Sequence, residues 1–88
     1  MKITVKYFLE YARLSGCRGE ELFFENDELI SVKEVFKNLN NKYKIKYEDV
    51  ANKGIILANN RSITQLDMEN TVLRDGDKLI LMPMISGG

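Results

Sequence analysis

Hydrophobic and polar residues alternate at the start of the chain, where Ile3, Val5 and Tyr7 are separated by polar side chains. A period of two places one face of a strand on a core and the other in water. We therefore expect a strand over residues 2–8. Residues 10–14 predict a short helix that ends at a glycine, and residues 20–25 predict a second strand. The short connection makes these two strands antiparallel.

A capping box marks the start of the main helix. Ser31 can accept a hydrogen bond from an amide in the first turn, while Glu34 reaches back to the serine amide. Apolar residues then recur at positions i, i+3, i+4 and i+7, which forms one stripe along a helix. The pattern predicts a helix over residues 32–43 that packs on a sheet.

The second half of the chain predicts strands and turns. Residues 44–53 have no clear period. The apolar run 54–58, closed by two asparagines, predicts a buried strand, and residues 63–66 predict a short partner strand. The Asp-Gly-Asp sequence at 75–77 predicts a turn before a last strand over residues 78–82.

This order of elements predicts an α+β fold of the β-grasp type. We expect a mixed sheet of four to five strands, with one main helix across one face and a flexible C-terminal Gly-Gly tail. The first and last strands should lie side by side in the middle of the sheet and run parallel. The whole chain, 1–88, forms one domain, with the tail at 83–88.

Composition narrows the function classes. Thirteen basic and thirteen acidic side chains cancel, so no overall field draws the protein to nucleic acid or to a membrane. No apolar run reaches the ~18 residues that span a bilayer, and no signal peptide is visible. Cys17 is the single cysteine, which excludes an internal disulfide and fits a reducing compartment. We expect a cytoplasmic protein.

The chain has no histidine, so most nucleophilic triads and histidine-based zinc sites cannot be built from it. Any acid or base for catalysis should come from another subunit. The strongest candidate for chemistry is the end of the chain, Gly87-Gly88. Without side chains, these residues can pass through a narrow channel. The preceding apolar run is unlike a linker that stays in solvent.

Four stretches of the sequence resemble the ubiquitin-like sulfur carriers, and among them the small-subunit family of molybdopterin synthase. They are Val5-Lys6-Tyr7-Phe8, Asn59, Asp75-Gly76-Asp77, and Pro83 with the Ser86-Gly87-Gly88 end. Together they cover nearly the whole chain. The family usually has a second proline where this chain has Met84.

The resemblance implies that an adenylating enzyme of the ubiquitin-activating type, using ATP and Mg, activates the Gly88 carboxylate. A sulfur donor then converts it to a thiocarboxylate. The tail, Pro83, Met84, Ile85, Ser86 and Gly87, would carry it into the synthase large subunit, in a heterotetramer of two small and two large subunits. There the sulfur converts cyclic pyranopterin monophosphate to molybdopterin, for molybdenum cofactor biosynthesis. This chain itself would bind no cofactor.

Physical chemistry agrees with this division of labour. A chain-end carboxylate, with a pKa of roughly 3.3 to 3.7, is ionised at neutral pH and is a poor electrophile. It needs activation before sulfur can add.

Pro83 also marks the end of a strand because it has no amide hydrogen. Beyond it, Met84 and Ile85 suit an interface, because methionine adapts to a partner groove.

Other functions remain open. The protein could be a ubiquitin-like modifier that forms isopeptide bonds, a sulfur carrier for thiamine or tRNA thiolation, or a plain interaction domain with a frayed end. A modifier would yield covalent conjugates. An interaction domain would not need its two terminal glycines.

Three further features have simpler explanations than chemistry. Cys17, beside an arginine, could be a nucleophile, but an unreactive small side chain is the simpler interpretation. The run 42–47 alternates lysines with aromatic or aliphatic residues, and we expect a solvated helix end and loop there rather than a nucleic-acid platform. The acidic residues of 20–28 need no metal, and Asp75 and Asp77 belong to a turn.

Overall fold

The alternating start of the chain forms a strand near the centre of a sheet. The computed structural model describes residues 1–25 and 28–84. β1 (Lys2–Tyr7) directs its three alternate apolar side chains into the core, where each is at most 2% exposed. It pairs antiparallel with β2 (Gly19–Phe23) and parallel with β7 (Lys78–Pro83). The predicted parallel pairing of the first and last strands is confirmed.

The main sheet has five strands in the order β2-β1-β7-β4-β5. β4 (Gly54–Ala58) runs antiparallel to β7, and the two-residue β5 (Arg61–Ser62) follows it at the edge. A second, two-stranded sheet joins β3 (Leu29–Ser31) to β6 (Val72–Arg74). The predicted α+β, β-grasp architecture with a mixed sheet is confirmed.

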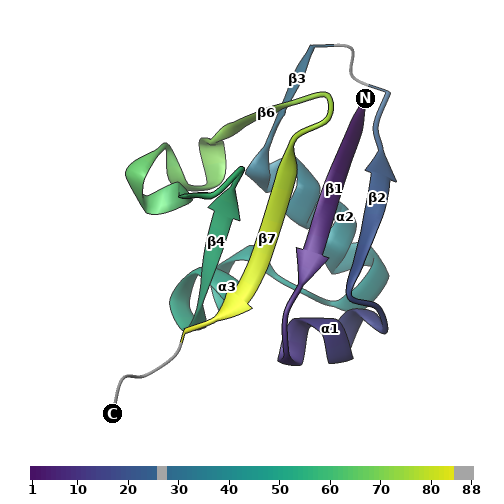
Figure 1. Cartoon of the computed structure of the whole chain (residues 1–88), viewed down its shortest axis with the longest axis vertical. Coiled ribbons are helices and arrows are strands. Elements are labelled where there is room, and N and C mark those ends of the chain that lie inside the picture. Colours follow the sequence, from purple (N-terminus) through teal and green to yellow (C-terminus); the bar gives the residue numbers. More distant parts are fainter. Residues whose placement is uncertain (26–27, 85–88) are drawn as a thin grey trace.

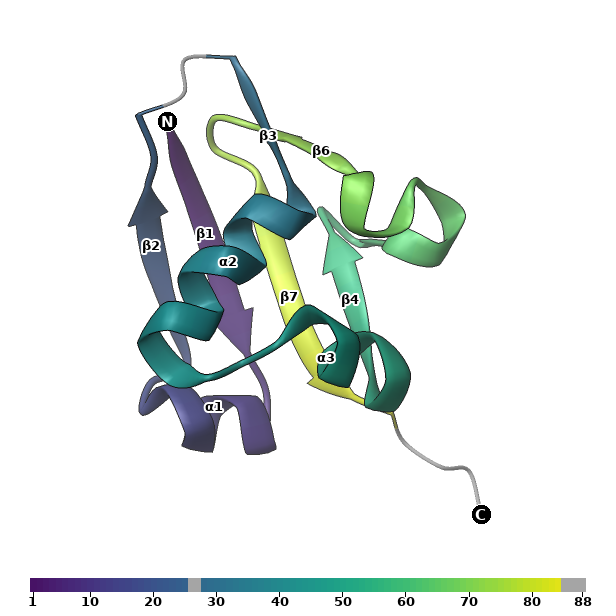
Figure 2. The ribbon, with the colours of Figure 1, turned by 180° about the vertical axis from the view of Figure 1, so that it is seen from behind.

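The main helix crosses one face of the sheet. α2 (Val32–Tyr43) has the predicted bounds, and its capping box is present, with the Glu34 amide donating to Ser31 Oγ at 3.2 Å. Its buried stripe packs against one face of the sheet. Figure 2 shows α2 in front of the strands, and Figure 1 shows the opposite face of the sheet, which no helix crosses. The short helix α1 (Glu10–Ser15) ends at Gly16, which has a φ of 79°. Glycine adopts this left-handed conformation without strain, so it suits the end of a helix.

Two expectations for the second half were incomplete or wrong. Residues 44–53 contain α3 (Tyr47–Lys53), which buries Val50. The predicted strand over 63–66 was wrong, because these residues begin a 3₁₀ turn, η1 (Ile63–Gln65), that is capped by Ser62 and inserts Ile63 into the core. A second turn, η2 (Met68–Asn70), follows.

The predicted turn before the last strand is confirmed at Gly76, whose φ is 87°. Ile85, Ser86, Gly87 and Gly88, on which the predicted flexible tail mainly falls, lie outside the described residues. Among the described residues, no helix is long and apolar enough to cross a membrane.

Candidate functional site

The base of the tail is mounted on β7, between β1 and β4. Pro83 is the last residue of this strand, opposite Gly54, and Met84 follows it beyond the strand as predicted. Met84 is 59% exposed, and its amide donates to the Lys53 carbonyl at 3.3 Å. Met82, predicted to be partly core, is half-buried. The tail therefore begins at the end of β7, a strand that pairs with β1 on one side and with β4 on the other.

Pro83 ends the pairing of β7 with β1. In this parallel ladder the Phe8 amide donates to the Leu81 carbonyl at 3.0 Å. The alternation of a parallel ladder makes residue 83 the next donor toward β1. Proline has no amide hydrogen, so that bond cannot form. On the β4 side one more hydrogen bond forms, from the Met84 amide to the Lys53 carbonyl. The tail begins after this bond.

The helix-free face of the sheet is apolar next to this exit. Because Leu79 and Leu81 point to the core, Ile80 and Met82 point to the other face. The ladder places Leu57 opposite Ile80 and Ile55 opposite Met82. We call these four half-buried residues, Ile55, Leu57, Ile80 and Met82, the open sheet face. No helix covers it in the described part of the chain (Figures 1 and 2).

Basic side chains lie beside the open sheet face. Lys6, which is exposed, is opposite Ile80 on β1, and Lys78 is opposite Thr4. Lys2, on the same face of β1, forms an ion pair with Glu21 at 2.9 Å. An apolar centre with a charged rim is the arrangement found in protein–protein interfaces.

The open sheet face was not predicted from the sequence, in which residues 54–58 indicate a buried strand. The available signal was that residues 55–57 and 79–82 are apolar without alternation. This pattern means that both faces of a strand are apolar, and so need cover on both sides.

Exposed apolar residues also flank the exit on the α1 side. Phe8 and Leu9 are 45% and 73% exposed. Leu9 has a φ of 53°, which is unusual for a residue with a branched side chain. A depression of about 470 Å³ is lined by Leu9, Glu10, Arg13 and Pro83. A protein that encloses the tail would meet this apolar corner and its arginine.

A glycine lies directly under the base of the tail. A Cβ atom on Gly54 would lie 2.6 Å from the Met82 carbonyl oxygen and 2.7 Å from the Tyr11 hydroxyl. Tyr11 is 4% exposed, and burial, followed by the charges of Glu10 and Asp49, raises its pKa. The backbones of β4 and β7 and the phenol of α1 therefore meet at this position.

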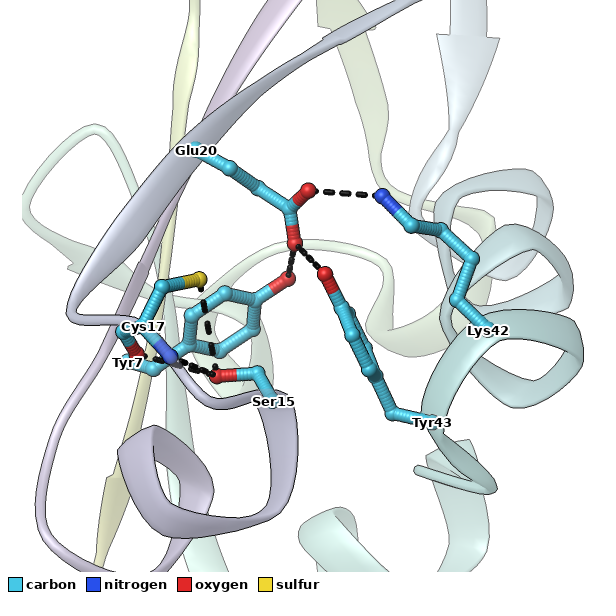
Figure 3. A network of polar contacts seen from close by, with 6 residues as sticks. All are labelled: Tyr7, Ser15, Cys17, Glu20, Lys42 and Tyr43. Carbon is cyan, nitrogen blue, oxygen red and sulfur yellow. Dashed lines mark hydrogen bonds and ion pairs between the residues drawn. The ribbon is translucent and has the colours of Figure 1, made fainter.

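The described residues also contain one polar cluster away from the tail (Figure 3). The Glu20 carboxylate accepts hydrogen bonds from Tyr7 Oη at 2.7 Å and Tyr43 Oη at 2.5 Å, and it contacts Lys42 Nζ at 2.6 Å. Burial acts to raise the pKa of Glu20, but the bonds from Lys42, Tyr43 and Tyr7 outweigh it and lower that pKa. Burial and Glu20 raise the pKa of Tyr7. The cluster joins β1, β2 and α2.

The expected helix end and loop over 42–47 is present, since α2 ends at Tyr43 and a loop of exposed lysines follows it. The segment is not solvated throughout, because Tyr43 donates to Glu20 and Ile45 is only 2% exposed. Cys17 is half-buried, with its Sγ 3.7 Å from Ser15 Oγ. In the described part of the chain no group of acidic or cysteine residues could hold a metal ion. Because it links β1, β2 and α2, the Glu20 cluster has a structural role.

We predict that the Glu20 cluster makes stability fall in acid. The lowered pKa means that the folded state binds the Glu20 proton less readily than the unfolded state. Its contribution is present above the unfolded pKa of about 4.3 and is lost as the pH falls through the folded value. Urea denaturation of Glu20→Gln at pH 7 should show a loss of about 2 kcal/mol. The loss should shrink below about pH 4. An equal loss at pH 7 and pH 3 would contradict this.

The sequence profile of the ThiS family matches residues 5–88. The chain belongs to the ThiS family. This match covers both the open sheet face and the glycine end. No sequence among curated proteins matches the chain.

Solved structures agree with the fold of this ThiS-family chain. Small archaeal modifier protein 1 from Methanosarcina acetivorans is 24% identical, with a TM-score of 0.80 over 99% of this chain and 96% of that one. A complex of subunits 1 and 2 of molybdopterin-converting factor from Helicobacter pylori contains a chain that is 24% identical, with a TM-score of 0.66 and complete coverage of both chains. Urm1 from Trypanosoma brucei is 17% identical, with a TM-score of 0.72 over 99% of this chain and 95% of that one. At these identities the likeness establishes the β-grasp fold alone.

Proposed function

We propose that this ThiS-family chain is the sulfur carrier subunit of a molybdopterin synthase. It delivers sulfur as a Gly88 thiocarboxylate, which converts cyclic pyranopterin monophosphate to molybdopterin. The observation that carries the proposal is the family match over residues 5–88, which includes the Gly-Gly end. The base of the tail supports it, because β7 is paired on both sides up to the proline.

The chemistry needs groups that this chain does not supply. The Gly88 carboxylate attacks the α-phosphorus of ATP, with Mg, in the adenylating partner and releases pyrophosphate. A sulfur nucleophile then displaces AMP from the acyl carbon and leaves a thiocarboxylate. The chain has no histidine, and its one cysteine lies with Ser15 at the end of α1. Acid and base catalysis therefore belongs to the partners, and this chain acts as a protein cosubstrate.

The open sheet face would bind these partners. Its four apolar side chains lie next to the last strand pairs before the exit, so a protein that covers them also surrounds the tail. The Helicobacter pylori relative is found in a complex of two different subunits. By analogy, we propose a synthase large subunit as the partner here, in a heterotetramer of two small and two large chains.

Mass spectrometry tests the proposal. The chain is incubated with the adenylating enzyme of the same genome, ATP, Mg and a sulfur donor. The intact mass should rise by one sulfur-for-oxygen exchange, and the product should convert cyclic pyranopterin monophosphate when the large subunit is added. A chain that lacks Gly88 should keep its mass and its thermal unfolding midpoint. An unchanged mass with an adenylating enzyme that is active on its own carrier would refute the proposal.

A protein-modifier function is the second candidate, because a structural relative with a TM-score of 0.80 is a small archaeal modifier protein. A modifier forms isopeptide bonds between its terminal carboxyl group and lysines of other proteins. Expression of an affinity-tagged chain should then give a series of covalent conjugates that disappears when Gly88 is deleted. A carrier gives the thiocarboxylate without that series.

A further inference from the structure

A groove of about 880 Å³ lies between the end of β1, the start of β2 and the helix α1. Figure 1 shows α1 next to the end of β1 and the start of β2. Lys6, Phe8, Leu9 and Arg18 are among the residues that line the groove. Leu9 also lines the depression that contains Pro83, so the groove adjoins the base of the tail.

The two cations of this groove are not neutralised, whereas its two carboxylates are. Glu20 is bound by side chains of α2, and Glu21 forms an ion pair with Lys2 at 2.9 Å. Lys6 and Arg18 are exposed, and neither forms an ion pair with any residue that the structure describes. Two positive charges are therefore left for a group outside the described part of the chain.

The groove also offers apolar surface beside these charges. The side chains of Phe8 and Leu9 are largely exposed and line it. Gly19, which is opposite Lys6 on β2, has no side chain to fill the groove. An occupant that matches this surface carries carboxylates for the two cations and an apolar side chain for Phe8 and Leu9.

We propose that the groove binds an acidic segment of the synthase large subunit, whose Asp or Glu carboxylates pair with Lys6 and Arg18. Arginine suits this role because its guanidinium group can hold a carboxylate through two parallel hydrogen bonds. Complementary charges at the border of an interface set the orientation of the two proteins and speed their association. The pairing would thus direct the large subunit toward the end of the domain from which the tail leaves.

The distance to the reactive residue identifies this occupant. Gly88 lies four residues after Met84, and four extended residues span at most about 14 Å. The protein that takes up Gly88 must therefore lie against the end of the domain that carries α1 and the groove. It would also cover the open sheet face, which Lys6 borders because it is opposite Ile80. The inference rests on the proposed function, since it concerns the same partner.

Charge reversal at Arg18 tests the pairing by calorimetric titration. Arg18→Glu should raise the Kd for the large subunit of the same genome about tenfold or more, whereas Arg18→Lys should keep most of the affinity. Lys37→Glu is the matched control, because it reverses an exposed cation on α2, which covers the face of the sheet opposite to Lys6. This control should bind with the Kd of the unsubstituted chain.

The salt dependence of binding separates a charge effect from a change of shape. From about 0.1 M to about 1 M NaCl the screening length falls from about 10 Å to about 3 Å. The affinity of the unsubstituted chain should therefore fall more steeply with salt than that of Arg18→Glu. Equal slopes for the two chains would show that Arg18 has no charged partner in the complex, which contradicts the inference.

Carbodiimide cross-linking tests Lys6. The reagent joins an amine to a carboxyl group as an amide with loss of water, so a peptide with Lys6 should be recovered joined to an Asp or Glu of the large subunit. A Lys6 cross-link to a second copy, formed without the large subunit, would assign the groove to self-association and overturn the inference.

The failure of this inference can be told from that of the proposed function. If Ile80→Lys abolishes binding while Arg18→Glu binds normally and Lys6 is not cross-linked, the inference is wrong and the proposed function stands. If no complex forms and no thiocarboxylate appears, both are wrong.

Discussion

Replacement of Ile80 by lysine is expected to raise the Kd for the large subunit about 100-fold. Ile80 is central in the open sheet face, opposite Leu57 on one side and Lys6 on the other. An ammonium group at this position would have to be desolvated without a partner when the face is covered. It would also lie beside a lysine of the same sign. In the free chain this position is only half-buried, so a lysine there stays in contact with water. The large loss of affinity arises because the complex would bury the position completely.

The fold should survive this change, which makes the result interpretable. The Ile80 side chain points away from the core, whereas its neighbours Leu79 and Leu81 are fully buried. Thermal unfolding should therefore shift by only a few degrees. Val72→Lys, at a 49% exposed apolar position on β6, is the control and should bind normally. Calorimetric titration that gives the same Kd for Ile80→Lys and the unsubstituted chain would show that the open sheet face is not the interface.

Elements that local residues determine were predictable from the sequence. The main helix follows from a serine and a glutamate three residues apart and from one apolar stripe. The turn at 75–77 follows from a glycine in the left-handed region. These signals lie within a few residues of each other, so no knowledge of distant contacts was needed.

Short elements that depend on distant contacts were not predictable. β3 and β6 have three residues each, and Ile30 pairs with Leu73 across more than forty positions of sequence. α3 has fewer than two turns, so its apolar set of Tyr47, Val50 and Ala51 gives a single repeat of the helical period. Such segments take their structure from what they pack against, which a single sequence does not reveal.

The same distinction applies to the site. Pro83 and Met84 could be assigned to the end of the last strand from their own residue types. The open sheet face could not, because a continuous apolar strand looks alike whether its second face is covered by a helix or by another protein. Only the arrangement of the described helices, which lie on one side of the sheet, shows that no helix among the described residues covers the second face.

Substitution of Gly54 by alanine is expected to lower the free energy of unfolding by about 3 kcal/mol. The added methyl group would lie 2.6 Å from the Met82 carbonyl oxygen, 2.7 Å from Tyr11 Oη and 3.2 Å from the Val50 carbonyl oxygen. Two of these atoms are backbone atoms of β7 and α3, so relief requires the strands to separate where the tail begins. A marginally stable domain of this size would lose a large share of its stability.

Urea denaturation of three variants distinguishes this contact from the general cost of losing a glycine. Gly16→Ala also replaces a glycine, but nothing lies within 4 Å of the added atom, so only its φ of 79° is penalised. That variant should lose about 1 kcal/mol. Combining Gly54→Ala with Tyr11→Phe removes one of the three close contacts and should recover part of the stability, because the two carbonyl contacts remain. Equal losses for Gly54→Ala and Gly16→Ala would mean that β4 and β7 can separate at this position at little cost, and that the base of the tail is not rigidly held.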